Sequence, residues 1–137
     1  MTTYTHKVNY YETDIMGITH HSNYIRFMEE ARMQYLTEIG YPMKRIEEEG
    51  ITSPVVAVSC DYKQPTTYDD EIEIVVAVSS YNGVKLCLSY TMTNKASGAL
   101  VATATSSHCF IDAVNRRPVS VKKSYPDLDT VLKAQLA

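Results

Sequence analysis

The 137-residue chain has no tryptophan, only three cysteines and no long apolar run. Cys60, Cys87 and Cys109 are odd in number and far apart, so neither a disulfide framework nor a closely spaced zinc site is predicted. No apolar run approaches the roughly 18 residues that span a bilayer. Residues 1–7 lack the apolar core of a secretory signal. We therefore expect no membrane span and a reducing, cytoplasmic location.

The chain also lacks an excess of positive charge. Its 13 lysines and arginines are outnumbered by 16 aspartates and glutamates, which gives a net charge of −3. This balance gives no electrostatic reason to expect a nucleic-acid partner. The composition is 45% hydrophobic and 21% charged, and no linker or internal repeat interrupts it. Residues 1–137 are therefore predicted to form one folded domain with its own core.

The first part of the chain predicts a strand and then a long helix. Apolar and polar residues alternate over residues 4–11, which indicates the strand. Apolar side chains then recur every three or four residues over residues 24–39, which indicates an amphipathic helix of about 18 residues. Ser22 or Asn23 can cap its start, and Gly40 marks its end.

The remainder predicts an antiparallel sheet. Alternation of period two indicates four further strands, over residues 56–62, 72–78, 84–92 and 99–111. Asn82-Gly83 is the strongest hairpin signal, because both residues tolerate positive φ. The tail predicts a short closing helix capped by Ser124. The order of elements predicts an α+β fold in which a five-stranded antiparallel sheet wraps around one long central helix.

Between the first strand and the long helix lies a loop that contains Asp14 and Gly17. A helix N-terminus carries partial positive charge and free N–H groups, so it can stabilise an oxyanion. A carboxylate that faces this end can attack a carbonyl carbon or deprotonate water. Gly17 can let a ligand approach the backbone closely. The alternative is structural, since an aspartate before a helix is commonly a turn or capping residue.

Several residues resemble a known family. The opening signature of the hotdog-fold acyl-CoA thioesterases is similar to Tyr11-Glu12-Thr13-Asp14, Gly17, His21, Asn23-Tyr24, Phe27, Glu29 and Ala31-Arg32. Within that superfamily, the chain most resembles the 4-hydroxybenzoyl-CoA thioesterase and tol-pal-associated (YbgC-like) branch. Later segments resemble the family in order and spacing: Tyr62-Lys63-Gln64-Pro65, Asp70-Glu71-Ile72 and Asn115-Arg116-Arg117-Pro118-Val119. The chain departs from the pattern at Met16, where the family often has a small residue.

The resemblance implies a hydrolase that converts an acyl-CoA thioester to a free acid and CoA. It implies no metal and no cofactor, because coenzyme A is part of the substrate. It also implies side-by-side homodimers, often assembled into homotetramers, with each active site at a dimer interface. Asp14 would be the nucleophile or general base and would be favoured over its neighbour Glu12. The N–H of His21 at the helix start would bind the thioester oxygen, and Gly17 would complete the catalytic loop.

The resemblance also implies a set of substrate contacts. The helix would supply Tyr24, and a strand of the partner subunit would line the channel with Ser59, Cys60 and Tyr62. Cations near the channel mouth would meet the phosphates of CoA: Lys63, Arg116 and Arg117. Each of these residues also has an ordinary structural role as its alternative. Two other functions stay open, a thioesterase for acyl groups on a carrier protein and a non-catalytic hotdog module that binds acyl-CoA.

Overall fold

The computed structural model describes residues 3–136, in which five strands form one antiparallel sheet. The strand order across the sheet is β1 (Thr3–Lys7), β4 (Glu71–Tyr81), β5 (Lys85–Asn94), β6 (Leu100–Cys109) and β3 (Val55–Tyr62). This sheet confirms the predicted α+β class. Residues 1, 2 and 137 of the predicted domain lie outside the described residues, and residues 1 and 2 also belong to the segment searched for a secretory signal.

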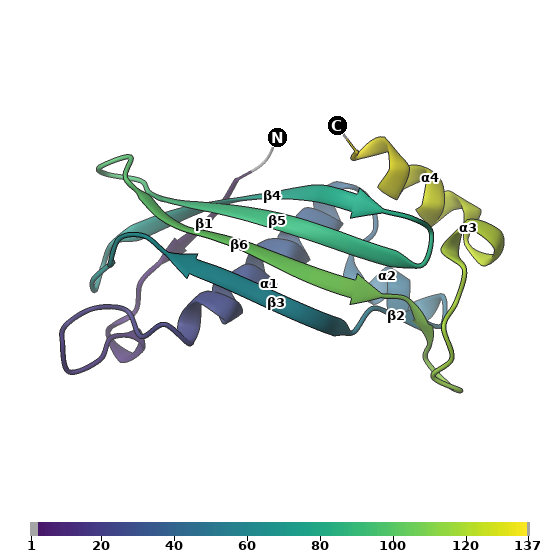
Figure 1. Ribbon diagram of the computed structural model, residues 1–137, viewed down its shortest axis with the longest axis horizontal. Coiled ribbons are helices and arrows are strands. Elements are labelled where there is room, and N and C mark those ends of the chain that lie inside the picture. The colour runs from purple at the N-terminus through teal and green to yellow at the C-terminus, as the bar shows by residue number, and fades with distance from the viewer. Residues whose placement is uncertain (1–2, 137) are drawn as a thin grey trace.

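The helix α1 (Asn23–Glu38) lies against one face of the sheet (Figure 1). It has 16 residues, close to the expected length, and ends before Gly40, whose φ is +91°. The closing helix predicted in the tail is α4 (Pro126–Ala134), a second helix of more than two turns in addition to α1. Shorter elements complete the fold: η1 (Tyr10–Glu12), α2 (Met43–Glu48), β2 (Ile51–Thr52), β7 (Ile111–Asp112) and α3 (Val121–Ser124). No helix within residues 3–136 is both long and apolar enough to cross a bilayer.

The core lies between α1 and the inner face of the sheet. The helix and the sheet each bury the apolar residues of one face. These are Tyr24, Phe27, Met28 and Ala31 from α1, and Ile72, Ile74, Val76, Leu86, Leu88, Tyr90 and Met92 from β4 and β5. These strand residues are alternate positions, as the predicted period of two requires. Burying each large apolar side chain stabilises the fold by about 1.5–3 kcal/mol. Hydrophobic burial therefore fixes which face of each element points inward.

The first strand is shorter than predicted. It ends at Lys7, and residues 10–12 form a single 3₁₀ turn, η1. The Glu12 N–H donates to the Asn9 carbonyl at 2.9 Å, and the Asn9 N–H donates to Glu12 Oε1 at 2.7 Å. These local bonds offer the backbone an alternative to the sheet ladder. The alternation over residues 4–11 therefore predicted a strand where a turn forms.

Two predicted turn residues act differently from expectation. In the hairpin between β4 and β5, Gly83 has a φ of +91°, but Asn82 does not adopt positive φ. The Asn82 side chain instead accepts hydrogen bonds from the N–H groups of Val84 and Lys85 at 3.0 and 2.7 Å. The predicted cap Ser124 is the last residue of α3, and α4 begins at Pro126. Proline suits a first helical position because it lacks an N–H that would need a partner.

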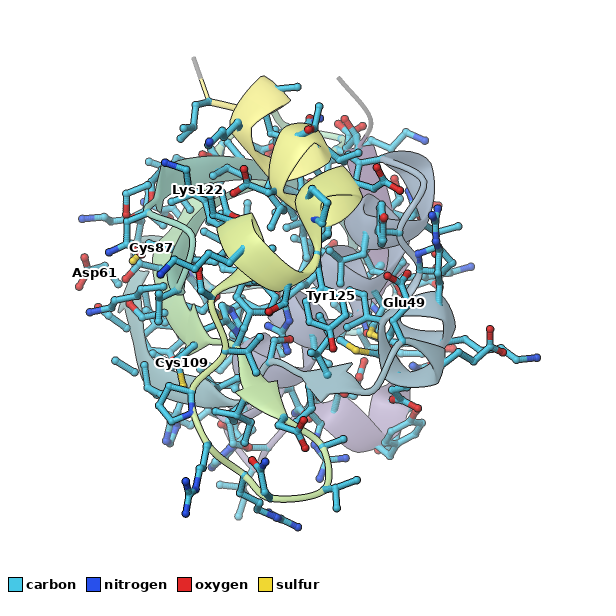
Figure 2. The ribbon with its side chains drawn as sticks, turned by 90° about the vertical axis from the view of Figure 1, so that its right-hand side faces the viewer. Glu49, Asp61, Cys87, Cys109, Lys122 and Tyr125 are labelled. Carbon is cyan, nitrogen blue, oxygen red and sulfur yellow. The ribbon has the colours of Figure 1, made fainter. Side chains whose placement is uncertain are left out.

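The C-terminal helices α3 and α4 lie at the end of the sheet away from the loop between η1 and α1 (Figure 1). Figure 2 shows Tyr125, between α3 and α4, beside Glu49 of the segment that follows α2, and its hydroxyl donates to the Glu49 carbonyl at 3.1 Å. The Tyr81 hydroxyl at the end of β4 donates to Asp129 Oδ1 at 2.5 Å, and Lys133 Nζ lies 2.9 Å from Asp129 Oδ2. The Tyr81 hydroxyl, followed by Lys133, lowers the pKa of Asp129.

The variant Tyr81→Phe is expected to lower the free energy of unfolding by about 1.5–3 kcal/mol at pH 7, because it removes a hydrogen bond to a charged group. Because the pKa of Asp129 is lower in the folded state, its contribution is complete above the unfolded value of about 3.9 and is lost as pH falls through the folded value. The difference between variant and wild type should therefore narrow at acid pH. Urea unfolding at pH 7 and at pH 3 measures both effects, and an unchanged difference would contradict the role of Asp129.

Candidate active site

The loop that carries Asp14 is a closed turn. The Asp14 N–H donates to the Ile18 carbonyl, and the Gly17 N–H donates to the Asp14 carbonyl, each at 2.9 Å. Gly17 has a φ of +79°, which favours glycine over residues with a Cβ atom. The Met16 N–H donates to Asp14 Oδ1 at 2.9 Å, whereas Oδ2 makes no hydrogen bond within residues 3–136. The turn therefore holds one carboxylate oxygen and leaves the other available.

A buried hydroxyl cluster attaches this loop to the segment after β3. The Thr19 N–H donates to the Thr66 carbonyl at 2.8 Å, and the two Oγ1 atoms are 2.6 Å apart. Tyr24 of α1 places its hydroxyl 2.9 Å from Thr66 Oγ1. The Thr67 hydroxyl donates to the Gly17 carbonyl at 2.9 Å. Loop, helix and strand end are thus tied together around Thr66.

His21 lies two residues before the first residue of α1. The Tyr62 hydroxyl donates to its carbonyl at 3.0 Å, while its N–H makes no hydrogen bond among the residues that the structure describes. Ser22 occupies the N-cap position without capping, because its hydroxyl lies 2.8 Å from Nδ1 of His20. The predicted capping by Ser22 is therefore wrong. The N–H groups of Ser22, Asn23 and Tyr24 already have acceptors, so the His21 N–H is the group at the helix entrance that a ligand can use.

A cavity of about 340 Å³ opens between the loop, the start of α1 and the end of β3. Five predicted site residues line it: Asp14, His21, Tyr24, Tyr62 and Lys63. The rest of the lining is Met16, Ile18, Thr19, Gln64 and Pro65. The rings of Tyr24 and Tyr62 meet edge to face with centroids 5.2 Å apart. Loss of hydration, followed by the nearby Cys60, raises the pKa of Tyr62 to about 12. Tyr62 therefore stays a neutral hydrogen-bond donor.

The remaining predicted contacts do not reach this cavity in one protomer. Cys60 is half-buried against the core, and its burial raises the pKa of the thiol. Ser59 lies on the outer face of β3, the face from which Asp61 points away from the molecule (Figure 2). Arg116 and Arg117 lie in the exposed loop between β7 and α3, at the opposite end of the sheet from the Asp14 loop (Figure 1).

A model of the thioesterase-like superfamily matches residues 8–136, nearly the whole chain. The chain belongs to this superfamily. This confirms the predicted hotdog thioesterase family and its enzyme class, the thioester hydrolases.

Individual relatives agree with the assignment. The thioesterase is 36% identical over 124 residues to YneP of Bacillus subtilis, a protein to which an acyl-CoA thioesterase activity is provisionally assigned; the match covers 90% of this chain and 89% of YneP. It is 26% identical to the acyl-CoA thioester hydrolase YbgC of Escherichia coli, over 86% of this chain and 87% of YbgC. The crystal structure of a DHNA-CoA thioesterase from Staphylococcus aureus superposes with a TM-score of 0.92 at 26% identity, over 97% and 89% of the two chains.

Two contributions to the site of this thioesterase were not predicted. Thr66 follows a segment that resembles the family, but nothing in the sequence indicates that its hydroxyl meets Thr19 and Tyr24. Glu12 was considered only as a rival of Asp14. It is instead buried, with Oε1 2.8 Å from Nε2 of His6. The inward position of His6 on the first strand was the one available signal, because alternation places it with Tyr4 and Val8.

Proposed function

We propose that this thioesterase hydrolyses acyl-CoA to a free acid and CoA. The observation that carries the proposal is the placement of the Asp14 carboxylate and the entrance of α1 on one cavity. The names of YneP and YbgC support CoA as the thiol carrier. The carrier-protein and non-catalytic alternatives make different predictions for turnover.

In the proposed reaction the thioester oxygen accepts a hydrogen bond from the His21 N–H. Charge that develops on this oxygen is then stabilised by the helix entrance. Asp14 Oδ2 either takes a proton from a water that attacks the carbonyl carbon or attacks that carbon itself. In both routes the tetrahedral intermediate collapses by breaking the C–S bond, and the CoA thiolate takes up a proton. Attack by water gives the free acid at once. Direct attack gives a mixed anhydride of the acyl group with Asp14, and water then hydrolyses this anhydride at the Asp14 carboxyl carbon, which releases the acid with Oδ2 of Asp14. Single turnover in ¹⁸O-labelled water separates the routes, because only direct attack lets unlabelled oxygen from Asp14 enter the first product.

A panel of CoA thioesters with short, long and aromatic acyl groups tests the activity. We expect hydrolysis of at least one member. Tight binding without hydrolysis across the panel would instead favour the non-catalytic module. The best acyl group is then compared on CoA and on an acyl-carrier protein, and a higher kcat/KM on the carrier protein would favour the second enzyme function.

We also propose that the working unit is a homodimer formed through β3. This strand lies at an edge of the sheet, and seven of its eight residues are exposed, among them Val55, Val56 and Val58. A long apolar edge strand of this kind is a template for pairing with another chain. A two-fold axis would pair the strand with its own copy in antiparallel orientation. Assembly of two such dimers into the predicted homotetramer stays a prediction.

Antiparallel pairing has a consequence for the active site. It sets the start of the partner's β3 beside the end of this strand, where Tyr62 lines the cavity. The loop with Arg116 and Arg117 lies at the end of the sheet where β3 starts (Figure 1). The partner's copy of that loop would therefore approach the cavity of the first protomer. In this arrangement the arginines of one chain would contact the phosphates of the CoA bound in the cavity of the other chain.

The double variant Arg116→Glu/Arg117→Glu is expected to raise KM for acyl-CoA by about tenfold or more, because it removes charge-assisted hydrogen bonds to phosphate. The KM for the matching acyl-pantetheine, which lacks the nucleotide, should change less than twofold. The control Lys44→Glu reverses an exposed charge on α2. Equal changes for both substrates would show that the arginines do not contact the nucleotide.

A further inference from the structure

A buried histidine–glutamate pair lies just before the Asp14 loop in the chain. His6 of β1 and Glu12 of η1 are 8% and 6% exposed, and His6 Nε2 is 2.8 Å from Glu12 Oε1. The same oxygen accepts the Asn9 N–H at 2.7 Å. The other ring nitrogen of His6, Nδ1, lies 3.4 Å from Oε2 of Glu30 on α1. A histidine between two carboxylates is thus held against the helix and the turn at once.

The main chain of Glu12 links this pair to both halves of the proposed site. Its carbonyl accepts the His20 N–H at 2.8 Å and the Asn23 side-chain amide at 2.9 Å. His20 immediately precedes His21, and Asn23 is the first residue of α1. In the other direction, Glu12 is two residues from Asp14. Glu12 is therefore hydrogen-bonded to the residues at the helix entrance and is joined to Asp14 through a single intervening residue.

The energetics of such a pair point to a role other than stability. Burying a carboxylate costs free energy, and an apolar pair of similar volume is commonly as stable as a buried ion pair. The surroundings here are already apolar, because the His6 ring packs on Phe27 with centroids 4.0 Å apart. Across the neighbouring strand β4, His6 pairs with Ile72, which is also buried. What an apolar pair cannot supply is a defined direction for η1.

We infer that His6 and Glu12 are positioning residues for the hydrolysis, an inference that rests on the proposed function. The His6–Glu12 pair fixes the orientation of η1. The orientation of η1 then sets the distance between Asp14 and the His21 N–H at the start of α1. Neither side chain touches the substrate. A displacement of about 1 Å between catalytic groups can lower a rate by about a hundredfold.

The central experiment compares a disruptive single variant with an apolar double variant. His6→Leu leaves Glu12 buried without its partner, so both kcat and Tm should fall, kcat by about 10- to 100-fold. His6→Leu/Glu12→Leu removes the buried carboxyl group as well, so Tm should recover while kcat stays low. KM should remain within about twofold of wild type in both variants, because positioning acts mainly in the transition state. Wild-type kcat in the stable double variant would overturn the inference.

Two further measurements separate positioning from general loss of structure. His6→Gln keeps a donor for Glu12 and should recover most of the lost kcat. Exchange of the His20 amide hydrogen with solvent should be at least about tenfold faster in the double variant, because its acceptor on Glu12 is no longer held. Unchanged protection of His20 together with a low kcat would contradict the proposed link through the Glu12 carbonyl.

A matched control exists on the same strand. Lys7 forms an exposed ion pair with Asp69, with Nζ 3.0 Å from Oδ1, and as the next residue of β1 it lies on the opposite face from His6. Lys7→Gln should leave kcat unchanged. Asp14→Asn is measured in parallel. Full activity in Asp14→Asn would overturn the proposed catalytic role of Asp14, whereas an inactive Asp14→Asn with a fully active His6→Leu would overturn the positioning role alone.

Discussion

Replacement of Asp14 by Asn is expected to lower kcat for acyl-CoA hydrolysis by about a thousandfold, within the range for loss of a general base or nucleophile. The amide keeps an oxygen that can accept the Met16 N–H, the bond now made by Asp14 Oδ1 at 2.9 Å. The loop should therefore retain its shape. What is lost is a carboxylate oxygen that can take up a proton or attack the carbonyl carbon.

Steady-state kinetics and thermal unfolding test this expectation together. KM and Tm should stay close to wild type, because Asp14 is proposed to act mainly in the transition state. Asp127→Asn is a suitable control, since it makes the same chemical change at an exposed position on α4. An Asp14→Asn variant with activity within threefold of wild type would exclude Asp14 as the essential group.

Charge placed on the open edge of β3 is expected to abolish both assembly and activity. In Val56→Lys/Val58→Lys, two exposed apolar side chains become cations that would face their copies across the two-fold axis. We expect a monomer and a fall in kcat/KM of at least about a hundredfold, because the proposed site needs residues from both chains. Sedimentation equilibrium gives the mass, and kinetics on the same samples give the activity.

Met33→Lys, which introduces a single lysine at an exposed apolar position of α1, serves as the control. A folded, fully active monomer from the β3 variant would contradict the shared site. A dimer of unchanged stability would contradict pairing through β3.

Mixing two impaired proteins tests the shared site in another way. Asp14→Asn and Arg116→Glu/Arg117→Glu each damage both sites of their own dimer. After subunit exchange in equal amounts, half of the dimers should be mixed, and one of the two sites in each mixed dimer should be intact. Activity at low substrate should therefore rise to about a quarter of wild type. No recovery after verified exchange would mean that Asp14 and the two arginines act within one chain.

The secondary structure could be read from the sequence to a large extent, because hydrophobic burial imposes a local period. The residues that alternate in β4 and β5 and those that recur along α1 are the ones that fill the core. Gly17 and Gly40 correctly indicated positions where the backbone adopts positive φ. Where polar side chains compete for the backbone, the same patterns failed. Asn9 and Glu12 convert the end of a predicted strand into η1, and Asn82 closes its hairpin through its side chain.

The sequence by itself determined that Asp14 stands in a glycine-containing turn before a helix, because these features depend on neighbours within a few residues. Only the tertiary structure decided what surrounds that turn. Thr66 meets Thr19 and Tyr24 across more than 40 positions of sequence, and His6 reaches Glu12 from a strand. It also separated Arg116 and Arg117 from the cavity of their own chain (Figure 1). Such contacts depend on how elements pack and on which edge stays open, and no local period in a sequence encodes either.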